Sequence, residues 1–349
     1  MELADISKLR DWEVPEQYLK ISTVDVHTGG EPLRIIVDGF PSIKGSTVLE
    51  KRSYVREHYD HLRTSLMWEP RGHSDMYGAI IVEPNSSAAD FGVIFLHNEG
   101  YSTGCGHAVL GLTKTFVETG LIKSTGETTD VVMDVPSGMI HAEAISENGK
   151  VIGARFRNVL SFVQCLDGEV DVVDYGTVRY DIAFGGAFYA FVNVSEIGMD
   201  ALPGQSSSLI SAGMAIRKAL AEAVAMDHPN EPEMNHLYGT IFVADSDQPE
   251  VHSRHVCIFA DGQIDRCPTG TGVSARLAIL HERGMAKMNQ AITIDSILGT
   301  SFSGCVVEIQ TLNGREAVIP EVTGTSHITG RQTFVIDSDD PLKDGFLLR

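Results

Sequence analysis

The chain has 349 residues, of which 43% are hydrophobic, and its 47 acidic and 27 basic residues give it a formal net charge of −20 at pH 7. This length is typical of two domains of roughly 150 residues, and the hydrophobic fraction is sufficient for a core in each of them. The strong negative charge disfavours binding to nucleic acids and to anionic membrane surfaces, because both carry phosphate groups.

The N-terminal segment from Met1 to Lys20 has no apolar stretch typical of a signal peptide, and no apolar run approaches the roughly 18 residues that cross a membrane. We therefore expect a cytoplasmic protein with no membrane partner. The thirteen histidines are scattered, and the close pairs His58/His61 and His252/His255 lack an obvious third ligand, so we predict no metal site. Five widely spaced cysteines, an odd number, disfavour a disulfide framework.

Runs of β-branched and aromatic residues, bounded by Gly, Asn, Asp or Pro, predict strands throughout the chain. In chain order we expect them at 21–26, 33–37, 78–82, 91–97, 131–135, 151–156, 187–194, 238–244, 255–260, 291–294 and 306–310. Amphipathic helices are expected at about 48–66 and 207–226. Two further helices, which start at Cys105 and Thr269 and end before Gly120 and Gly284, are apolar on almost all sides, as is typical of a helix buried inside a sheet.

The second half of the chain repeats features of the first. DVHTGG at 25–30 is echoed by DIAFGG at 181–186, the two amphipathic helices correspond, and 105–122 aligns without gaps on 269–286. Three features in the same order favour two copies of one domain, each with its own core. We predict an α+β fold of two pseudo-symmetric domains, each a curved, mostly antiparallel sheet around a central helix.

Both buried helices begin at glycine-rich turns, GCGHAVLG at 104–111 and DRCPTGTG at 265–272. The N-terminus of a buried helix presents free amide donors and a partial positive charge, so it binds a carboxylate without a basic side chain. Two such ends facing each other would hold one carboxylate from both sides. The glycines let the backbone approach closely.

Cys105 lies at the first of these helix starts, where the dipole is expected to lower the thiol pKa and favour a thiolate near neutral pH. Most single cysteines are small buried hydrophobes. Flanking glycines and the neighbouring His107 favour instead a nucleophile, or a base that removes the proton beside a bound carboxylate. In the alignment Cys105 falls opposite Thr269, a hydroxyl too weakly acidic to return that proton. The pair therefore disfavours racemisation and favours β-elimination.

Two residues just before Thr269 leave alternatives open. Cys267 could in principle supply a second thiol, although the ungapped alignment and Pro268 place it outside the helix start. Asp265 is either a turn or N-cap aspartate or a group that binds a substrate ammonium, and its sequence context favours binding.

Taken together, these segments resemble the proline racemase family, which shares the fold of diaminopimelate epimerase. DVHTGGEP at 25–32 and EPRGHSDM at 69–76 add to the resemblance, which runs from about residue 20 to 280. Racemases and hydroxyproline epimerases of the family carry a second cysteine at the position of Thr269. Cys105 with Thr269 resembles the trans-3-hydroxy-L-proline dehydratase branch, and family members have Ser at the position of Cys267.

The resemblance implies a cofactor-independent hydro-lyase with a small imino-acid substrate, and a homodimer, because family members are often dimers. Its implied catalytic pair is Cys105, the proton acceptor, with Thr269. The implied substrate-binding residues are Gly106, His107, Asp265, Gly270 and Thr271. His73 and Asp75 match a family motif and are assigned a positioning role. We place the first domain at 1–165, completed by about 330–349, and the second at 166–329, with the active site between them.

The expected reaction is dehydration of trans-3-hydroxy-L-proline to Δ1-pyrroline-2-carboxylate. In this substrate the hydroxyl is on the same ring face as the C2 hydrogen, so Cys105 would take the C2 proton as the hydroxyl leaves. The thiol, a water or His107 would protonate the leaving oxygen. Alternatives are proline racemase or 4-hydroxyproline 2-epimerase activity, which needs a second acid/base, and a non-catalytic imino-acid binder.

Overall fold

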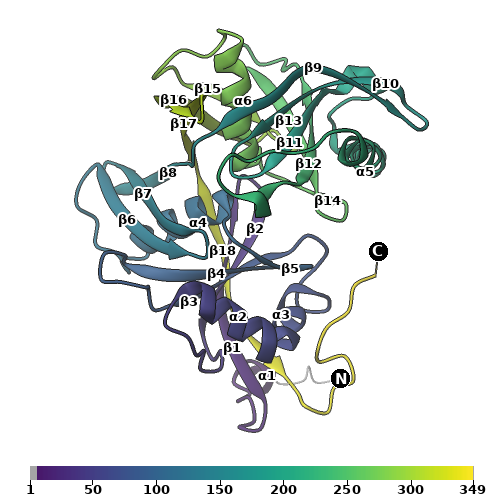
Figure 1. The fold of residues 1–349 in the computed structure, drawn as a ribbon. Helices are drawn as coiled ribbons and strands as arrows, with labels where there is room; N and C mark the ends of the chain where they lie inside the picture. Colours follow the sequence, from purple (N-terminus) through teal and green to yellow (C-terminus); the bar gives the residue numbers. More distant parts are fainter. Residues whose placement is uncertain (1–5, 349) are drawn as a thin grey trace.

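The computed structural model of the protein describes residues 6–348, which form two similar bodies joined by strands (Figure 1). The first body contains a sheet in which the strand β2 runs parallel to β3, and β4 runs parallel to β6, while the other neighbours are antiparallel. Its strands are β1 (Leu19–Thr28), β2 (Glu31–Asp38), β3 (Tyr77–Val82), β4 (Phe91–His97), β5 (Gly100–Ser102), β6 (Thr128–Val135), β7 (Gly138–Glu147) and β8 (Lys150–Arg157).

The second body repeats this order of pairing strand for strand. β11 runs parallel to β12 and β13 runs parallel to β15, as β2/β3 and β4/β6 do in the first body. Its strands are β9 (Phe162–Val172), β10 (Gly176–Phe184), β11 (Phe188–Asn193), β12 (Leu237–Ala244), β13 (Ser253–Phe259), β14 (Gln263–Ile264), β15 (Ile292–Asp295), β16 (Ser301–Leu312) and β17 (Arg315–Gly324). The predicted α+β fold with internal pseudo-symmetry is confirmed.

One buried helix lies inside each sheet. Helix α4 (Gly106–Glu118) packs against β1, β7, β8 and β18 (Ser326–Ile336), and helix α6 (Gly270–Glu282) packs against β9, β10, β16 and β17. Nearly every side chain of both helices is buried, which explains why neither has a polar face. Gly120 and Gly284, with φ of 77° and 69°, end the helices in the left-handed conformation that was expected.

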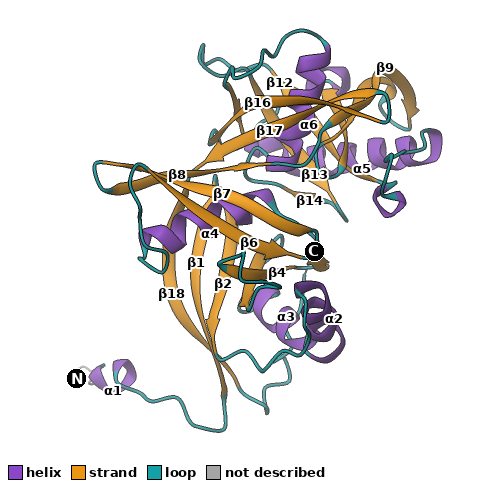
Figure 2. Cartoon of the chain, turned by 60° about the vertical axis from the view of Figure 1, so that its left-hand side comes forward, coloured by secondary structure: helices purple, strands orange, loops and turns teal. Residues whose placement is uncertain are grey.

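Additional helices cover the outer faces of the sheets (Figure 2). Helix α5 (Ser206–Ala223) fulfils the expectation at 207–226, but the single helix expected at 48–66 is two, α2 (Val48–His58) and α3 (Asp60–Met67). The chain bends at Tyr59, whose ring packs edge-on against Phe40 instead of continuing the helix. Short helical turns are α1 (Ser7–Arg10), η1 (Val194–Ile197), η2 (Pro203–Gln205) and η3 (Pro232–Met234). No helix within residues 6–348 is long and apolar enough to cross a membrane.

The chain crosses from one body to the other after β8 and again after β17. β8 and β17 pair antiparallel along residues 154–157 and 321–324, and each then leads into the other body. β9 pairs with β10, whereas β18 returns to pair with β1 along all ten residues of that strand (Figure 1). The predicted boundary at 165/166 falls inside β9, and the division into domains stays a prediction.

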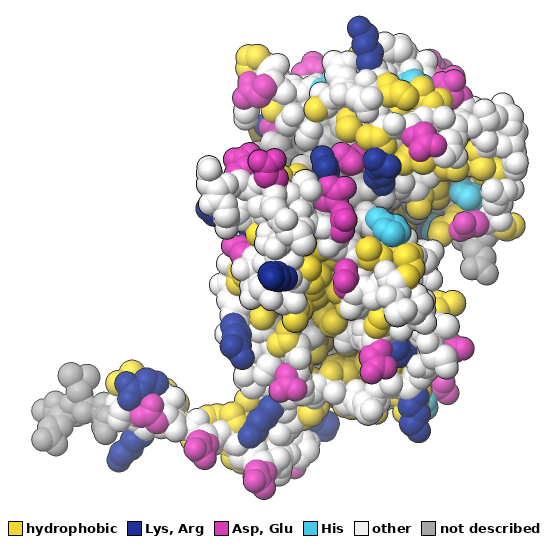
Figure 3. Space-filling model, turned by 90° about the vertical axis from the view of Figure 1, so that its left-hand side faces the viewer, with side chains coloured by type: hydrophobic (Ala, Val, Ile, Leu, Met, Phe, Trp, Pro, Cys, Tyr) yellow, Lys and Arg dark blue, Asp and Glu magenta, His cyan; other side chains and the backbone are white. Residues whose placement is uncertain are grey.

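Charged side chains bridge the bodies beside this β8–β17 pairing. Arg155 and Arg157 of β8 each lie 3.7 Å from the Glu321 carboxylate of β17, and Arg155 also contacts Glu143 of β7 at 2.6 Å. On this side of the molecule, acidic and basic side chains alternate at the narrowing between the bodies (Figure 3). Because these side chains are partly exposed, we assign them a modest share of the contact between the bodies.

Candidate active site

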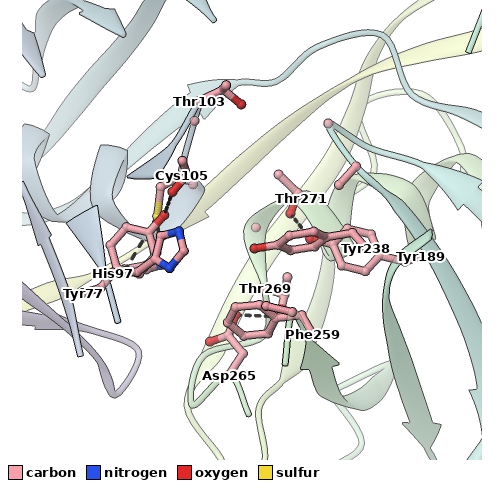
Figure 4. A pocket seen from close by; sticks show the side chains of 18 of the residues that line it. Tyr77, His97, Thr103, Cys105, Tyr189, Tyr238, Phe259, Asp265, Thr269 and Thr271 are labelled. Carbon is pink, nitrogen blue, oxygen red and sulfur yellow. Dashed lines mark hydrogen bonds between the residues drawn. The ribbon is translucent and has the colours of Figure 1, made fainter. Parts of the chain in front are cut away.

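A cavity of about 280 Å³ lies between the two bodies, and both buried helices begin at it. Figure 4 shows its two sides. The first wall is formed by Tyr77, Ser102 and the turn Cys105–His107 of the first body, and the second wall by Tyr189, Tyr238, Asp265 and the turn Thr269–Thr271 of the second. All seven residues predicted as catalytic or substrate-binding therefore line one cavity.

The helix starts meet at two glycines. A Cβ atom added to Gly106 would lie 3.3 Å from the Cα of Gly270, so the backbones are in close contact and only glycine fits easily. Neither N-cap residue, Cys105 or Thr269, caps its own helix with a side-chain hydrogen bond. Apart from the Ala108 amide, which interacts with the Cys105 thiol, the first-turn amides therefore remain available to an anion. No Lys or Arg is among the described residues that line the cavity, so an anion bound there would depend on backbone amides and neutral side chains.

Burial dominates the electrostatics of Cys105. It raises the pKa of the thiol to about 12, with the Asp265 and Glu31 carboxylates acting in the same direction. The Ala108 amide in the first turn and the Tyr77 hydroxyl lower the pKa, but they do not compensate for burial. The expectation that the helix dipole leaves Cys105 ionised near neutral pH is therefore wrong.

His107 lies against the Cys105 thiol, with its Nδ1 atom 3.1 Å from the sulfur. Burial lowers the pKa of its imidazole to about 4, so the ring is neutral. It also hydrogen-bonds the backbone of Pro32, which has no N–H, so the ring must donate there and its other nitrogen accepts. With the thiol pKa high and the imidazole pKa low, a thiolate–imidazolium pair is disfavoured.

These two pKa shifts predict a rising pH–rate profile. Only the thiolate removes a proton, and below the raised thiol pKa its fraction increases tenfold for each pH unit. We therefore expect kcat/KM to increase about tenfold per unit between about pH 6.5 and 8.5, before the substrate ammonium titrates. Initial rates in buffers of constant ionic strength measure this. A flat profile across that range would mean that the thiolate forms internally, with the proton on His107.

The second wall has a hydroxyl in place of the thiol, and its proton is already engaged. Thr269 Oγ1 donates to Asp265 Oδ2 at 2.7 Å, and the other Asp265 oxygen accepts the Cys267 amide at 2.8 Å. Because its proton is engaged by Asp265, the Thr269 hydroxyl can only accept further hydrogen bonds. Cys267 is 1% exposed, does not line the cavity and accepts the Thr269 amide at 3.3 Å. Burial raises its thiol pKa well above the usual range.

Two carboxyl groups lie at the base of the cavity. Asp265 is 6% exposed and has no basic side chain bonded to it in the described structure. Glu31 also lines the cavity, and burial together with the neighbouring Asp265 raises its pKa well above the usual range. Glu31 is missing from the predicted site, although it stands in the DVHTGGEP segment at 25–32. Glu31 also lies 3.8 Å from the Arg266 guanidinium, so Asp265 is the carboxyl group of the two that has no basic side chain bonded to it.

The two predicted positioning residues lie outside the cavity. Asp75 accepts from the guanidinium of Arg266 at 3.4 Å, and Glu31 accepts the Arg266 backbone amide at 2.8 Å. His73 is exposed, and its ring contacts the Ser74 carbonyl. Asp75 therefore contacts the turn that carries Asp265 from across the cleft, whereas His73 does not reach it.

Sequence reasoning missed the aromatic lining. Tyr77 and Tyr238 stand at the start of two predicted strands and occupy equivalent places in the two sheets, since Gly78 pairs with Leu96 as Gly239 pairs with Phe259. Tyr189 bonds the Thr271 hydroxyl at 2.8 Å. The sequence signal for Tyr77 and Tyr238 was an aromatic residue followed by a glycine at the same place in each repeat.

A small cavity between two copies of one fold, with two helix starts and the buried carboxyl groups of Asp265 and Glu31 in its lining, suits an amino or imino acid. A thiol faces the place where the carbon beside the carboxylate would lie. This combination defines the class: an isomerase or lyase that removes the proton from that carbon. Among residues 6–348 no group of three or more His, Cys, Asp or Glu side chains is arranged to hold a metal ion.

The chain belongs to the proline racemase family, whose defining region matches residues 23–347. It is 49% identical to a trans-3-hydroxy-L-proline dehydratase of Colwellia psychrerythraea, over 98% of this chain and 97% of the relative. It is 43% identical to a 3-hydroxyproline 2-epimerase of Burkholderia multivorans, over 94% and 98%.

Solved structures agree with this assignment. A hydroxyproline epimerase of Agrobacterium vitis, crystallised with bound trans-4-OH-L-proline, matches with a TM-score of 0.83 at 30% identity, over 95% of this chain and 96% of that one. A PhzF-family protein of Bacillus anthracis shares the fold alone, with a TM-score of 0.58 at 12% identity over 90% and 99%. The resemblance to the proline racemase family inferred from the sequence is thus confirmed.

Proposed function

We propose that the protein dehydrates trans-3-hydroxy-L-proline to Δ1-pyrroline-2-carboxylate, as a hydro-lyase that needs no cofactor. The observation that carries the proposal is the asymmetry of the cavity, with the Cys105 thiol on one wall and the Thr269 hydroxyl, bonded to Asp265, on the other. One wall can accept a proton and the other cannot return one. The dehydratase relative at 49% identity supports the same reaction.

Substrate binding follows from the charges of the cavity. The carboxylate takes the free amides at the two helix starts, with Gly106, His107, Gly270 and Thr271 around it. The ring ammonium lies at Asp265. Held in this way, the ring presents its C2 hydrogen and its 3-hydroxyl to the first wall. The amides also stabilise the negative charge that develops on the carboxylate as the C2 proton leaves.

A direct assay offers the purified protein trans-3-hydroxy-L-proline, trans-4-hydroxy-L-proline and L-proline separately. The cyclic imine should form from the first substrate alone. Formation of the C2 epimer of trans-4-hydroxy-L-proline, without imine from the 3-hydroxy substrate, would contradict the proposal.

A second candidate, C2 epimerisation, is favoured by one observation: a relative at 43% identity is a 3-hydroxyproline 2-epimerase. It would require a proton donor at the second wall. Incubation in D2O separates the two, because epimerisation leaves deuterium at C2 of an inverted, otherwise intact ring, whereas elimination consumes the ring hydroxyl. A cytoplasmic location and a homodimer remain predictions, the latter open to sedimentation analysis.

The variant Thr269→Cys should gain epimerase activity. It places a thiol on the second wall, opposite Cys105. In the native protein the hydroxyl at this position donates a hydrogen bond to Asp265. A thiol is a far better acid than a hydroxyl, so we expect C2 inversion of 4-hydroxyproline to rise at least about tenfold above the native level. Chiral chromatography of the recovered imino acid measures it.

The matched control is Thr269→Cys combined with Cys267→Ser, which excludes the buried thiol as the new acid. Inversion should be the same in both variants. If it disappears with Cys267, then the second wall has been assigned to the wrong residue.

A further inference from the structure

Elimination from trans-3-hydroxy-L-proline needs an acid as well as a base, because hydroxide is a poor leaving group. The following inference rests on the proposed function. In this substrate the 3-hydroxyl is on the same ring face as the C2 hydrogen, so the departing oxygen faces the first wall, beside Cys105. The acid must therefore belong to that wall, and a group on the second wall cannot reach the oxygen.

Tyr77 has the position that this role requires. It begins β3, lines the cavity on the Cys105 side and is only 7% exposed (Figure 4). Its ring packs edge-on against His107, with centroids 4.8 Å apart. Its hydroxyl hydrogen-bonds Ser102 Oγ and also contacts the Cys105 sulfur. The phenol is thus held at the place where the thiol and the departing oxygen would meet.

The other polar groups that line the cavity from the first body are less suited to protonate the oxygen. Glu31 is bonded to the Arg266 amide, and the Tyr101 hydroxyl donates to Asp60. Burial lowers the pKa of His97 to about 4, so its ring is neutral. His107 is neutral, and its one N–H is used by the Pro32 backbone. Ser102 has an aliphatic hydroxyl, a much weaker acid than a phenol. Burial raises the pKa of Tyr77 well above its usual range, so the phenol stays protonated at every pH at which the enzyme would work.

We propose that Tyr77 is a catalytic residue that donates its phenolic proton to the departing C3 oxygen. The Cys105 thiolate takes the C2 proton, the C2–H electron pair forms the C2–C3 double bond, and the C3–O pair leaves with the oxygen. Tyr77 protonates this oxygen to give water. The phenolate then takes the proton from the Cys105 thiol through their contact. Both side chains return to their starting forms. The C2–C3 enamine then tautomerises to Δ1-pyrroline-2-carboxylate as a proton moves from the nitrogen to C3, and nothing is oxidised or reduced.

The decisive experiment varies the leaving group. Tyr77→Phe keeps the ring against His107 and removes only the hydroxyl. With trans-3-hydroxy-L-proline we expect kcat to fall at least about 10²-fold, the usual contribution of a general acid. With trans-3-fluoro-L-proline, whose fluoride leaves without a proton, kcat should fall less than about fivefold, because C2 proton removal by Cys105 is preserved. If the Tyr77 hydroxyl had a purely structural role, its loss would reduce kcat equally for both substrates.

Tyr238→Phe is the matched control, because Tyr238 occupies the equivalent place on the second wall. Whatever its size, its effect should be the same for the hydroxy and the fluoro substrate. Ser102→Ala provides a second variant of the first wall: it removes the partner that orients the Tyr77 hydroxyl and should lower turnover of the hydroxy substrate selectively, by a smaller factor. Tyr77 is assigned wrongly if its variant slows both substrates equally or neither.

This result is distinguishable from failure of the proposed function. If the native protein forms no imine from trans-3-hydroxy-L-proline, the dehydratase assignment itself is wrong. If the native protein forms imine and Tyr77→Phe does so at the same rate, then the dehydratase assignment stands, and the acid is another group.

Discussion

Replacement of Cys105 by serine should reduce kcat for imine formation by at least about 10⁴-fold, because the reaction loses its base. The serine hydroxyl is far less acidic than the thiol, whose own pKa is already raised to about 12 by burial. The other polar groups that line the cavity from the first body are neutral imidazoles, hydroxyls and the Glu31 carboxyl, which accepts the Arg266 amide, and none of them replaces the thiol as the base at C2. Absorbance or chemical trapping of the cyclic imine measures the loss.

Binding should survive this substitution. The carboxylate is held by backbone amides and the ammonium by Asp265, so the dissociation constant of L-proline, measured by calorimetry, should change less than about threefold. Cys267→Ser is the matched control, since it removes a thiol that does not line the cavity. Its turnover should remain within about threefold of the native value. Equal losses in both variants would contradict the assignment of Cys105 as the base.

The second large effect is expected for Asp265→Asn, which keeps the shape of the side chain and removes its charge. Asp265 is buried with no basic side chain bonded to it, and it supports both Thr269 Oγ1 and the Cys267 amide. If it pairs with the ring ammonium, its neutralisation should lower kcat/KM by about 10²- to 10³-fold, mainly through KM. Steady-state kinetics with trans-3-hydroxy-L-proline test this.

The thermal stability of Asp265→Asn should not fall with its kcat/KM. The Asp265 charge raises the pKa of the buried Glu31 carboxyl, so the two groups repel each other when both are ionised. Asp265→Asn relieves that repulsion, and Tm should be unchanged or higher. Glu282→Gln, an exposed position on the same helix α6, is the control for loss of one charge and should leave kcat/KM within about twofold. A drop in Tm together with kcat would indicate a structural role instead.

The sequence was sufficient to predict features that depend on local pattern. The apolar helices and their glycine ends could be recognised from consecutive residues, and the repeat from short segments that align with each other. The strands that were missed are β5, β7, β9, β10, β14, β17 and β18. The longest of them include β9 and β18, which are half-exposed, and β18 contains Gly330 and Arg331. Their pairing with distant partners, not their own composition, makes them strands.

At the site, the helix starts could be paired by alignment, but their environment could not be derived. The thiolate expected at Cys105 followed from the local helix dipole, whereas its pKa is set by burial when the two bodies close over it. Glu31 and Tyr77 reach the cavity from β2 and β3, far from either glycine-rich turn in the sequence. A single sequence contains no local signal for such long-range neighbours.

Strands β9 and β18 each follow a point where the chain crosses from one body to the other, so the first body is completed only late in synthesis. During translation the first body emerges early. Its helix α4 is fully covered only when β18 has been made, because β18 packs against α4 and pairs with the whole of β1. Until the ribosome has added residues 326–336, the apolar face of that body stays open to chaperones and to aggregation. A truncation before Ser326 should therefore disable the Cys105 side of the molecule, which lies more than two hundred residues upstream.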